Sequence, residues 1–324
     1  MSRTLRLGTR GSPLALWQAR RIQALLERAG TRTELVTIRT TGDLIAQVPL
    51  ARIGTVALFT AQLDEALLAE RIDLAVHSLK DLPTGSCPGI EIAGVSERED
   101  PRDALVGRGP IRWGELPRGA TIATSSLRRR AELLRARPDL DVVEIRGNVD
   151  SRLAKLDATP AWTATVLATA GLLRLGLGDR IGERLPFDLM LPAPGQGALA
   201  VTTRDGDRAT ALVVRSAVHH VATALCVAAE RALLGRLEGG CQVPVGAFAR
   251  VVGEAGAVEV ELTARVVSLD GAHAVERSVT APAADEAAAA RLGEALAAAL
   301  RQAGAEPILE RARAAAPPAE VTEP

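Results

Sequence analysis

Tyrosine is absent from this chain of 324 residues, and phenylalanine and tryptophan together bring the aromatic content to only 2%. Proteins that bind single-stranded nucleic acid use aromatic side chains for base stacking and a basic surface for the phosphates. Basic and acidic side chains number 39 each, so the formal net charge is zero. The composition therefore predicts no nucleic-acid partner.

Long apolar runs and paired cysteines are also missing. No run of about eighteen apolar residues occurs, the length that a membrane helix requires, and the first ten residues contain no apolar signal core. The three cysteines, Cys87, Cys226 and Cys241, are an odd number at irregular spacing, which argues against a disulfide framework and a zinc site. We expect a cytoplasmic protein with no membrane span and no metal site.

The first two hundred residues alternate strand-like and helical segments. Such alternation predicts mostly parallel sheets covered by helices, and the length allows two α/β units of this kind. The predicted strands are Arg6-Leu7, Glu34–Arg39, Asp73–Val76, Ile90–Val95, Asp103–Val106, Thr121–Ala123, Val142–Ile145, Thr165–Ala168 and Ala198–Val201. Two predicted helices begin after the N-cap residues Ser12 and Thr60. Three more cover Leu127–Arg137, Val149–Leu156 and Leu172–Leu175.

Two irregular segments, Glu97–Arg102 and Leu191–Gly197, predict that the chain crosses from the first unit to the second and then returns. Beyond residue 218 the pattern changes to a smaller α+β unit. Its predicted elements are Thr223–Leu237, Val245–Val252, Val258–Leu269, a hairpin turn at Asp270-Gly271 and a helix over Asp285–Ala303. We therefore predict domains at 1–98 with 198–217, at 99–197 and at 218–313, and a disordered tail at 314–324.

Basic and hydroxyl side chains follow four of the predicted strands, at the sheet edge where α/β proteins bind ligands. Arginine in a first helical turn opposes the helix dipole and costs about 0.3 kcal/mol or more, so its repetition indicates function. A solvated charged face remains the alternative for any single arginine. Together they predict a cleft for several carboxylates or phosphates, formed by Arg10, Ser12, Lys80, Thr124, Ser126, Arg128, Arg129, Arg146 and Arg152.

Asp81 and Cys241 differ from these basic residues. A carboxylate at Asp81 would hydrogen-bond an N–H-bearing substrate and move its protons, but a turn cap before Leu82-Pro83 explains it equally well. Cys241 follows two glycines on a predicted loop, where an unpaired thiol is a candidate nucleophile. Cys87 also lies in a predicted loop, so spacing alone does not choose between these two cysteines.

At these positions the sequence resembles the porphobilinogen deaminase (hydroxymethylbilane synthase) family. The matching segments are Gly8–Leu16, Val76–Thr84, Glu97–Asp103, Thr124–Arg129, Arg146–Asn148, Leu191–Gly197, Ala229–Arg231 and Leu237–Pro244. The resemblance implies two periplasmic-binding-protein-like (type II) domains around a cleft, with a third domain that carries a cysteine. Nothing in the sequence demands an interface between copies, so we expect a monomer.

The same resemblance implies an enzyme that joins four porphobilinogen molecules head to tail and releases ammonia at each step. The growing chain would hang from a dipyrromethane cofactor held as a thioether by Cys241, with Asp81 catalytic, and the linear product would pass to the next tetrapyrrole-pathway enzyme. The implied binding residues are Arg10, Ser12, Lys80, Thr124, Ser126, Arg128, Arg129, Arg146, Gly147, Arg152 and Gln196.

The lid segment departs from the family pattern. Arg52 and Phe59 are retained, but Val56 stands where the family has lysine, and Ala61 and Gln62 replace a charged pair. One anion contact from the lid is therefore predicted to be missing. The alternatives are a divergent paralogue of low activity and a non-catalytic polycarboxylate receptor of the periplasmic-binding type, which would have a secretion signal and no special cysteine.

Overall fold

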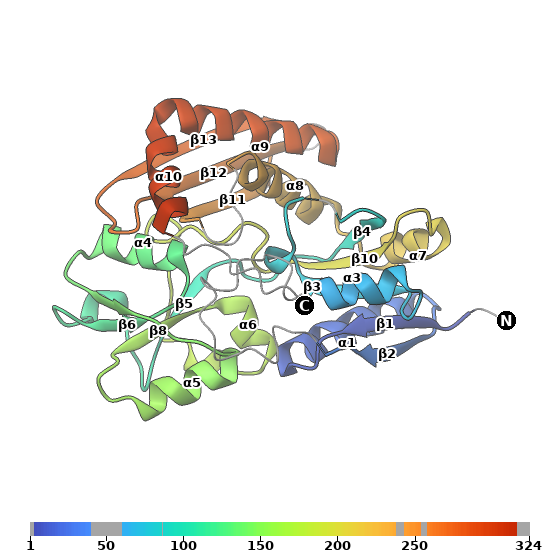
Figure 1. The fold of residues 1–324 in the computed structure, drawn as a ribbon, viewed down its shortest axis with the longest axis horizontal. Coiled ribbons are helices and arrows are strands. Elements are labelled where there is room, and N and C mark those ends of the chain that lie inside the picture. Colours follow the sequence, from blue (N-terminus) through green and yellow to red (C-terminus); the bar gives the residue numbers. More distant parts are fainter. Residues whose placement is uncertain (1–2, 40–59, 86, 238–242, 254–257, 316–324) are drawn as a thin grey trace.

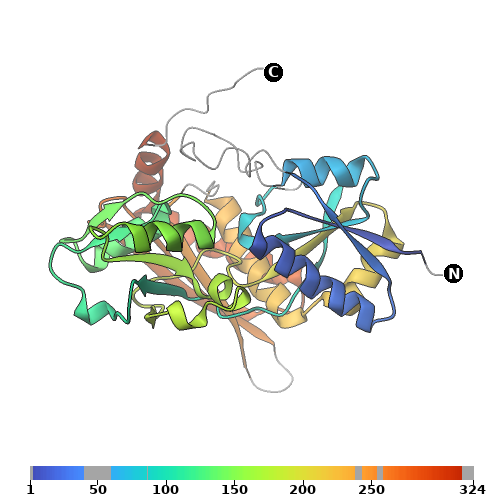
Figure 2. The ribbon, with the colours of Figure 1, turned by 90° about the horizontal axis from the view of Figure 1, so that it is seen from below.

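The computed structural model describes residues 3–39, 60–85, 87–237, 243–253 and 258–315. These residues form three sheets, each with its own helices, and we call the three parts the first, second and third lobes (Figure 1). The first and second lobes lie side by side (Figure 2). The third lobe lies against both of them.

The first lobe is built on a sheet with the strand order β2-β1-β3-β10-β4. Strand β1 pairs in parallel with β2 and β3, whereas β10 pairs antiparallel with β3 and β4, so β10 alone runs against the others. The elements are β1 (Leu5–Thr9), α1 (Pro13–Arg28), β2 (Thr33–Thr37), α3 (Ala61–Leu68), β3 (Leu74–Ser78), the 3-10 turn η3 (Leu79–Asp81), β4 (Ile90–Val95), β10 (Leu199–Arg204) and α7 (Arg208–Val218).

The second lobe repeats this plan with the order β7-β6-β8-β5-β9. Strand β6 is parallel to β7 and β8, and β5 is antiparallel to β8 and β9. The elements are β5 (Asp103–Gly107), β6 (Thr121–Ala123), α4 (Leu127–Ala136), β7 (Asp141–Val143), α5 (Val149–Ala158), β8 (Ala164–Ala168), α6 (Thr169–Arg174) and β9 (Glu183–Arg184). In each lobe the strand that runs against the others directly follows a crossing between the lobes.

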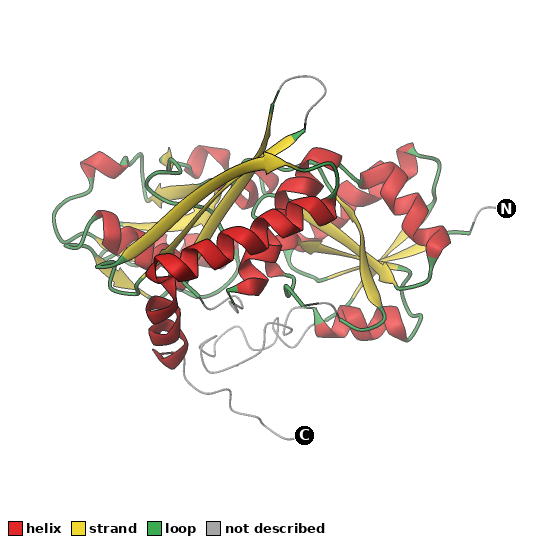
Figure 3. Ribbon diagram, turned by 90° about the horizontal axis from the view of Figure 1, so that it is seen from above, coloured by secondary structure: helices red, strands yellow, loops and turns green. Residues whose placement is uncertain are grey.

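The third lobe is an antiparallel sheet, β11-β12-β13, with α8 and α9 running along it (Figure 3). The two helices pack so closely that a Cβ at Gly293 would lie 2.0 Å from the Ala229 carbonyl oxygen, which requires glycine there. The elements are α8 (Val221–Arg236), β11 (Val245–Val252), β12 (Glu259–Val267), β13 (Ala274–Pro282), α9 (Glu286–Leu300), the π-turn η6 (Arg301–Ala305) and α10 (Glu306–Ala315).

Glu230 of α8 holds the two chain crossings together. Its carboxylate is fully buried and accepts hydrogen bonds from both terminal nitrogens of Arg98, at 2.7 and 3.1 Å. It also accepts from the backbone N–H groups of Gly195 and Ala249, both at 2.7 Å. Arg98 lies on the first crossing and Gly195 on the second, so the third lobe is fastened to the hinge between the other two.

The predicted fold class is confirmed: two α/β lobes accompany a smaller α+β lobe. Helices α7 and α10 and the short strand β9 were not predicted. Thr60 is the N-cap residue of α3 as predicted, but its hydroxyl makes no capping hydrogen bond, and the helix begins on the Thr60 carbonyl. The chain bends at Gly304, where φ is +98°, and α10 then extends into the first two residues of the predicted tail.

No described helix is by itself long and apolar enough to cross a membrane; α7 and α8 meet that test only as a pair, across a bend of 110°.

Candidate active site

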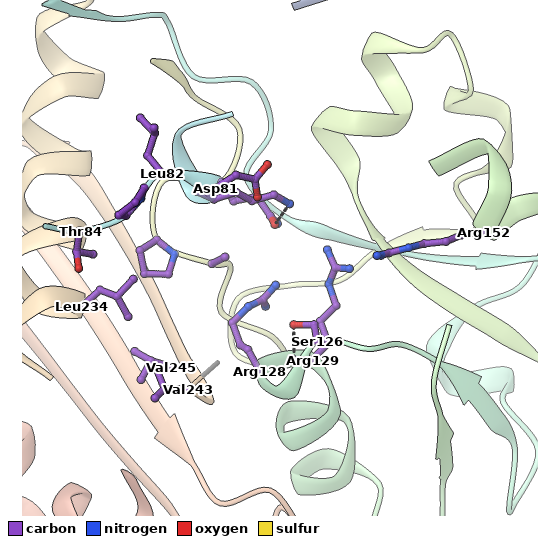
Figure 4. A pocket seen from close by; sticks show the side chains of 15 residues that line it. Asp81, Leu82, Thr84, Ser126, Arg128, Arg129, Arg152, Leu234, Val243 and Val245 are labelled. Carbon is purple, nitrogen blue, oxygen red and sulfur yellow. Dashed lines mark hydrogen bonds between the residues drawn. The ribbon is translucent and has the colours of Figure 1, made fainter. Parts of the chain in front are cut away.

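A cavity of about 230 Å³ lies where the three lobes meet, at the carboxyl end of β3 and the N-terminal ends of α4 and α5 (Figure 4). One side is cationic, and the facing side is apolar and includes Leu234 of α8, Val245 of β11 and Val243 just before that strand. The lining residues are Lys80, Asp81, Leu82, Pro83, Thr84, Ser126, Arg128, Arg129, Arg152, Ala193, Pro194, Gln196, Leu234, Val243 and Val245.

The start of α4 brings two arginines to this cavity. Ser126 is the N-cap, and its hydroxyl accepts the Arg129 backbone N–H at 3.4 Å. The unfavourable position of Arg128 and Arg129 in the first turn is offset by Asp103, whose carboxylate pairs with both at 2.7 and 2.8 Å. Burial raises the pKa of Asp103, but the two guanidinium groups lower it by more, so this pKa lies well below its usual range.

The two arginines differ in what they can still bind. Each of the three nitrogens of Arg129 already donates to the protein, Nε and Nη2 to Asp103 and Nη1 to the Val166 carbonyl. Arg128 uses only Nη1, which donates to Asp103 and to the Leu191 carbonyl. Its Nε and Nη2 form no hydrogen bond with any described residue. Arg128 is therefore the better anion ligand of the two.

Lys80 and Asp81 belong to the single turn that follows β3. Lys80 donates to the Gln196 side chain at 3.1 Å, and the Gln196 amide donates in turn to Asp103 at 3.0 Å. Burial lowers the pKa of Lys80 to about 8, which Asp81 only partly opposes. Within the described ranges no hydrogen bond reaches the Asp81 carboxylate, so the capping alternative for this residue finds no support.

The start of α5 contributes Arg152. Its Nε donates to the Gly147 carbonyl at 2.8 Å, while its terminal nitrogens make no hydrogen bond to the described part of the chain. Burial, together with the charges of Arg129 and Arg146, lowers the pKa of Arg152 to about 10. Gly147 has φ +116°, and a Cβ there would lie 2.7 Å from the Ser151 Cβ, so glycine is required.

A smaller cavity of about 70 Å³ adjoins the first and shares Asp81 with it. Arg10 and Ser12, which follow β1, line this cavity, so Asp81 lies between two groups of basic and hydroxyl side chains. His77 also lines it, but burial and the charge of Arg10 lower its pKa to about 4, which leaves the ring neutral at pH 7. The two cavities together form one candidate site.

Most of the predicted site residues therefore meet at one place. Lys80, Asp81, Ser126, Arg128, Arg129, Arg152 and Gln196 line the larger cavity, and Arg10 and Ser12 the smaller one. Thr124, Arg146 and Gly147 line neither. The Thr124 hydroxyl accepts the Ser126 N–H, the Gly147 carbonyl accepts from Arg152, and the buried Nε of Arg146 has no hydrogen-bond partner among the residues that the structure describes. Cys241, Arg52, Val56 and Phe59 lie outside the described residues.

Sequence reasoning missed Asp103 and the apolar side of the cavity. Asp103 was placed in a strand and at the end of one matching segment but was given no role, although an acidic residue at the start of a buried strand requires a partner. Leu234, Val243 and Val245 showed no signal that separates them from ordinary core residues. Arg174 and Gln18, which line a third cavity of about 100 Å³ beside Lys80, were also missed.

Comparison with known proteins gives a consistent result. The family model described as "Porphobilinogen deaminase, dipyromethane cofactor binding domain" matches residues 5–212, and "Porphobilinogen deaminase, C-terminal domain" matches residues 224–302. The porphobilinogen deaminase of Desulforudis audaxviator is 50% identical over 318 residues, covering 98% of this chain and all of the relative. That of Chlorobium chlorochromatii is 45% identical over 316 residues, covering 97% and 99%.

Among solved structures, an ABC transporter periplasmic substrate-binding protein from Coxiella burnetii is 17% identical with a TM-score of 0.43, covering 67% of this chain and 92% of that one. The methionine binding protein MetQ is 15% identical with a TM-score of 0.41, covering 66% and 89%. The family models cover most of the chain, and the relatives match almost its whole length. The chain belongs to the porphobilinogen deaminase family.

Proposed function

We propose that this chain is a hydroxymethylbilane synthase, a transferase that joins four porphobilinogen molecules into a linear tetrapyrrole and releases ammonia at each step. One observation carries the proposal: Asp81 borders both cavities and, within the described ranges, accepts no hydrogen bond, while cationic side chains lie around it. This arrangement suits a substrate that has carboxylates to bind and a pyrrole N–H to orient.

The larger cavity fits a dipyrromethane. Each pyrrole ring carries an acetate and a propionate, which the available nitrogens of Arg128 and Arg152 can bind as charge-assisted pairs. The facing residues Leu234, Val243 and Val245 suit the apolar ring faces. A buried guanidinium without an anionic partner is costly, and the lowered pKa of Arg152 reflects that cost, so a bound carboxylate would be stabilised here.

When bound, the dipyrromethane supplies the free α-carbon of its terminal pyrrole as the carbon nucleophile. Ammonia would leave as the aminomethyl C–N bond of the substrate breaks, the methylene carbon so released would form a C–C bond with that α-carbon, and the α-carbon would then lose its proton. Asp81 stabilises the positive charge that develops on the substrate pyrrole and is placed to accept that proton. Lys80 and Arg128 hold the carboxylates and so fix the ring positions relative to Asp81.

The proposal has further parts that rest on family membership. Cys241 forms the thioether to the cofactor, and the binding roles are those assigned above to Arg10, Ser12 and the cavity residues. The enzyme works as a cytoplasmic monomer and passes its product to the next tetrapyrrole-pathway enzyme. The three domains comprise residues 1–98 with 198–217, residues 99–197, and residue 218 to the end of α10 at Ala315.

Two measurements test the proposal. The purified chain should convert porphobilinogen with release of ammonia, and absence of turnover would reject the activity. It should also give colour with Ehrlich's reagent and have an intact mass above that of the sequence. Cys241→Ser should lose this added mass while Cys87→Ser keeps it; an adduct that persists in Cys241→Ser would place the attachment elsewhere.

A further inference from the structure

The turn that carries Asp81 is held at both ends. At its start, the Leu79 N–H donates to the Ala198 carbonyl at 3.0 Å, which fixes the turn to the sheet of the first lobe. At its end, the carbonyls of Leu82 and Pro83 accept hydrogen bonds from Nη1 and Nη2 of Arg231, at 3.3 and 2.6 Å. Arg231 lies on α8, so the end nearest Asp81 is held by the third lobe.

One face of α8 is docked on this segment. Ala224, Val227, Arg231 and Gly235 are spaced by three or four residues and so share a side of the helix. Ala224 and Val227 belong to the same buried cluster as Leu79 and Leu82. A Cβ at Gly235 would lie 3.5 Å from the Thr84 Cβ, which places the helix backbone directly against the segment.

We infer that Arg231 is a positioning residue that fixes the Asp81 carboxylate relative to the third lobe. Since no hydrogen bond to a described residue holds that carboxylate, its place depends on the backbone of the turn that carries it. The inference rests on the proposed function, in which the third lobe carries the cofactor thioether and Asp81 acts on a ring attached to it. Arg231 then keeps the Asp81 carboxylate at a fixed position relative to the reacting ring.

The physical expectation is a loss of rate rather than of binding. Misplacement of a catalytic group by about 1 Å can cost about 100-fold in rate. Arg231 does not line either cavity of the candidate site, so its replacement leaves the carboxylate-binding cations in place. The planar guanidinium spans two carbonyls, whereas a lysine ammonium offers a single point of attachment, so Arg231→Lys should restore only part of the function.

The test uses the full-length chain with its cofactor loaded. For Arg231→Gln we expect kcat to fall about 10- to 100-fold, KM for porphobilinogen to stay within about twofold, and the intact mass to keep the full adduct. Arg231→Lys should recover part of the lost kcat. Arg236→Gln is the matched control, because Arg236 is exposed on the same helix and makes no hydrogen bond to the Asp81 segment; its kcat and KM should stay within about twofold of the wild type.

Three results would overturn the inference. Unchanged kcat in Arg231→Gln would show that the turn keeps its place without the arginine. Loss of the adduct would assign Arg231 to cofactor attachment, and a lowered Tm with normal kcat and KM would assign it only to holding the lobes together. If the wild-type chain itself shows no turnover, the proposed function fails, and this outcome is distinct from a failure of the Arg231 variants alone.

Discussion

Asp81 of the first lobe and Asp103 of the second lobe are both close to the same cations, yet the structure uses them in opposite ways. Asp103 is fully buried and accepts four hydrogen bonds, from Arg128, Arg129 and Gln196. Asp81 lines two cavities and accepts none from any described residue. A carboxylate saturated with donors neither takes up a proton near neutral pH nor accepts a new ligand. Only Asp81 is available for chemistry.

The largest expected effect is on turnover at Asp81. Replacing a general acid–base group lowers rates by about 100- to 10,000-fold, so Asp81→Ala should lose turnover on that scale while the fold is kept. Assays with porphobilinogen and a thermal unfolding curve measure the two properties together. Near-normal turnover would show that Asp81 is not catalytic, and the proposed difference in role between Asp81 and Asp103 would then be wrong.

A substitution at Asp103 should act on stability instead. Asp103→Asn removes the charge that compensates Arg128 and Arg129, and breaking a buried pair in this way costs about 3–5 kcal/mol. Urea unfolding measures this loss. Asp157→Asn is the control, since its pair with Arg180 is exposed and worth at most about 1 kcal/mol. Equal effects at the two positions would show that the Asp103 cluster is not structural.

The difference between the aspartates could not be predicted from the sequence, although much of the site could. Ser12 and Ser126 cap α1 and α4 as predicted, because capping depends on residues only three positions apart. The placement of basic residues after strands follows from the same local patterns. The approach of Asp103 to Arg129 instead depends on β5 pairing antiparallel to β8, which no local pattern specifies.

The contacts of the third lobe were beyond sequence reasoning for the same reason. Arg231 and Leu82 are far apart in the chain, and only the docking of α8 brings them together. Helix α10 was not predicted because the bend at Gly304 separates it from α9, and the helical pattern of α9 ends there. Tertiary packing decides these features, whereas the sequence pattern reports mainly on neighbours along the chain.

Gln196 joins the two regions, and its removal should have an intermediate effect. The amide connects Lys80 in the first lobe to Asp103 in the second and is almost fully buried. Gln196→Leu leaves both charges without that partner, which should lower the free energy of unfolding by about 1–3 kcal/mol. Gln23→Leu, which loses a single half-buried bond to the Thr33 carbonyl, should cost at most about 1 kcal/mol. Similar losses of unfolding free energy in the two variants would show that Gln196 does not link the two lobes.

The smallest effect concerns Lys80 and pH. Its pKa of about 8 means that the side chain is charged below pH 8 and loses its proton as the pH rises through that value. Because only the charged form attracts carboxylates, kcat/KM should fall above pH 8, by about tenfold at pH 9 if the neutral form is inactive. Arginine stays charged throughout this range, so Lys80→Arg should remove the alkaline decline even where its maximal activity is lower. If the alkaline decline in kcat/KM persists unchanged in Lys80→Arg, the decline belongs to the titration of another group. Asp81 would then remain the first-lobe residue on which the chemistry depends.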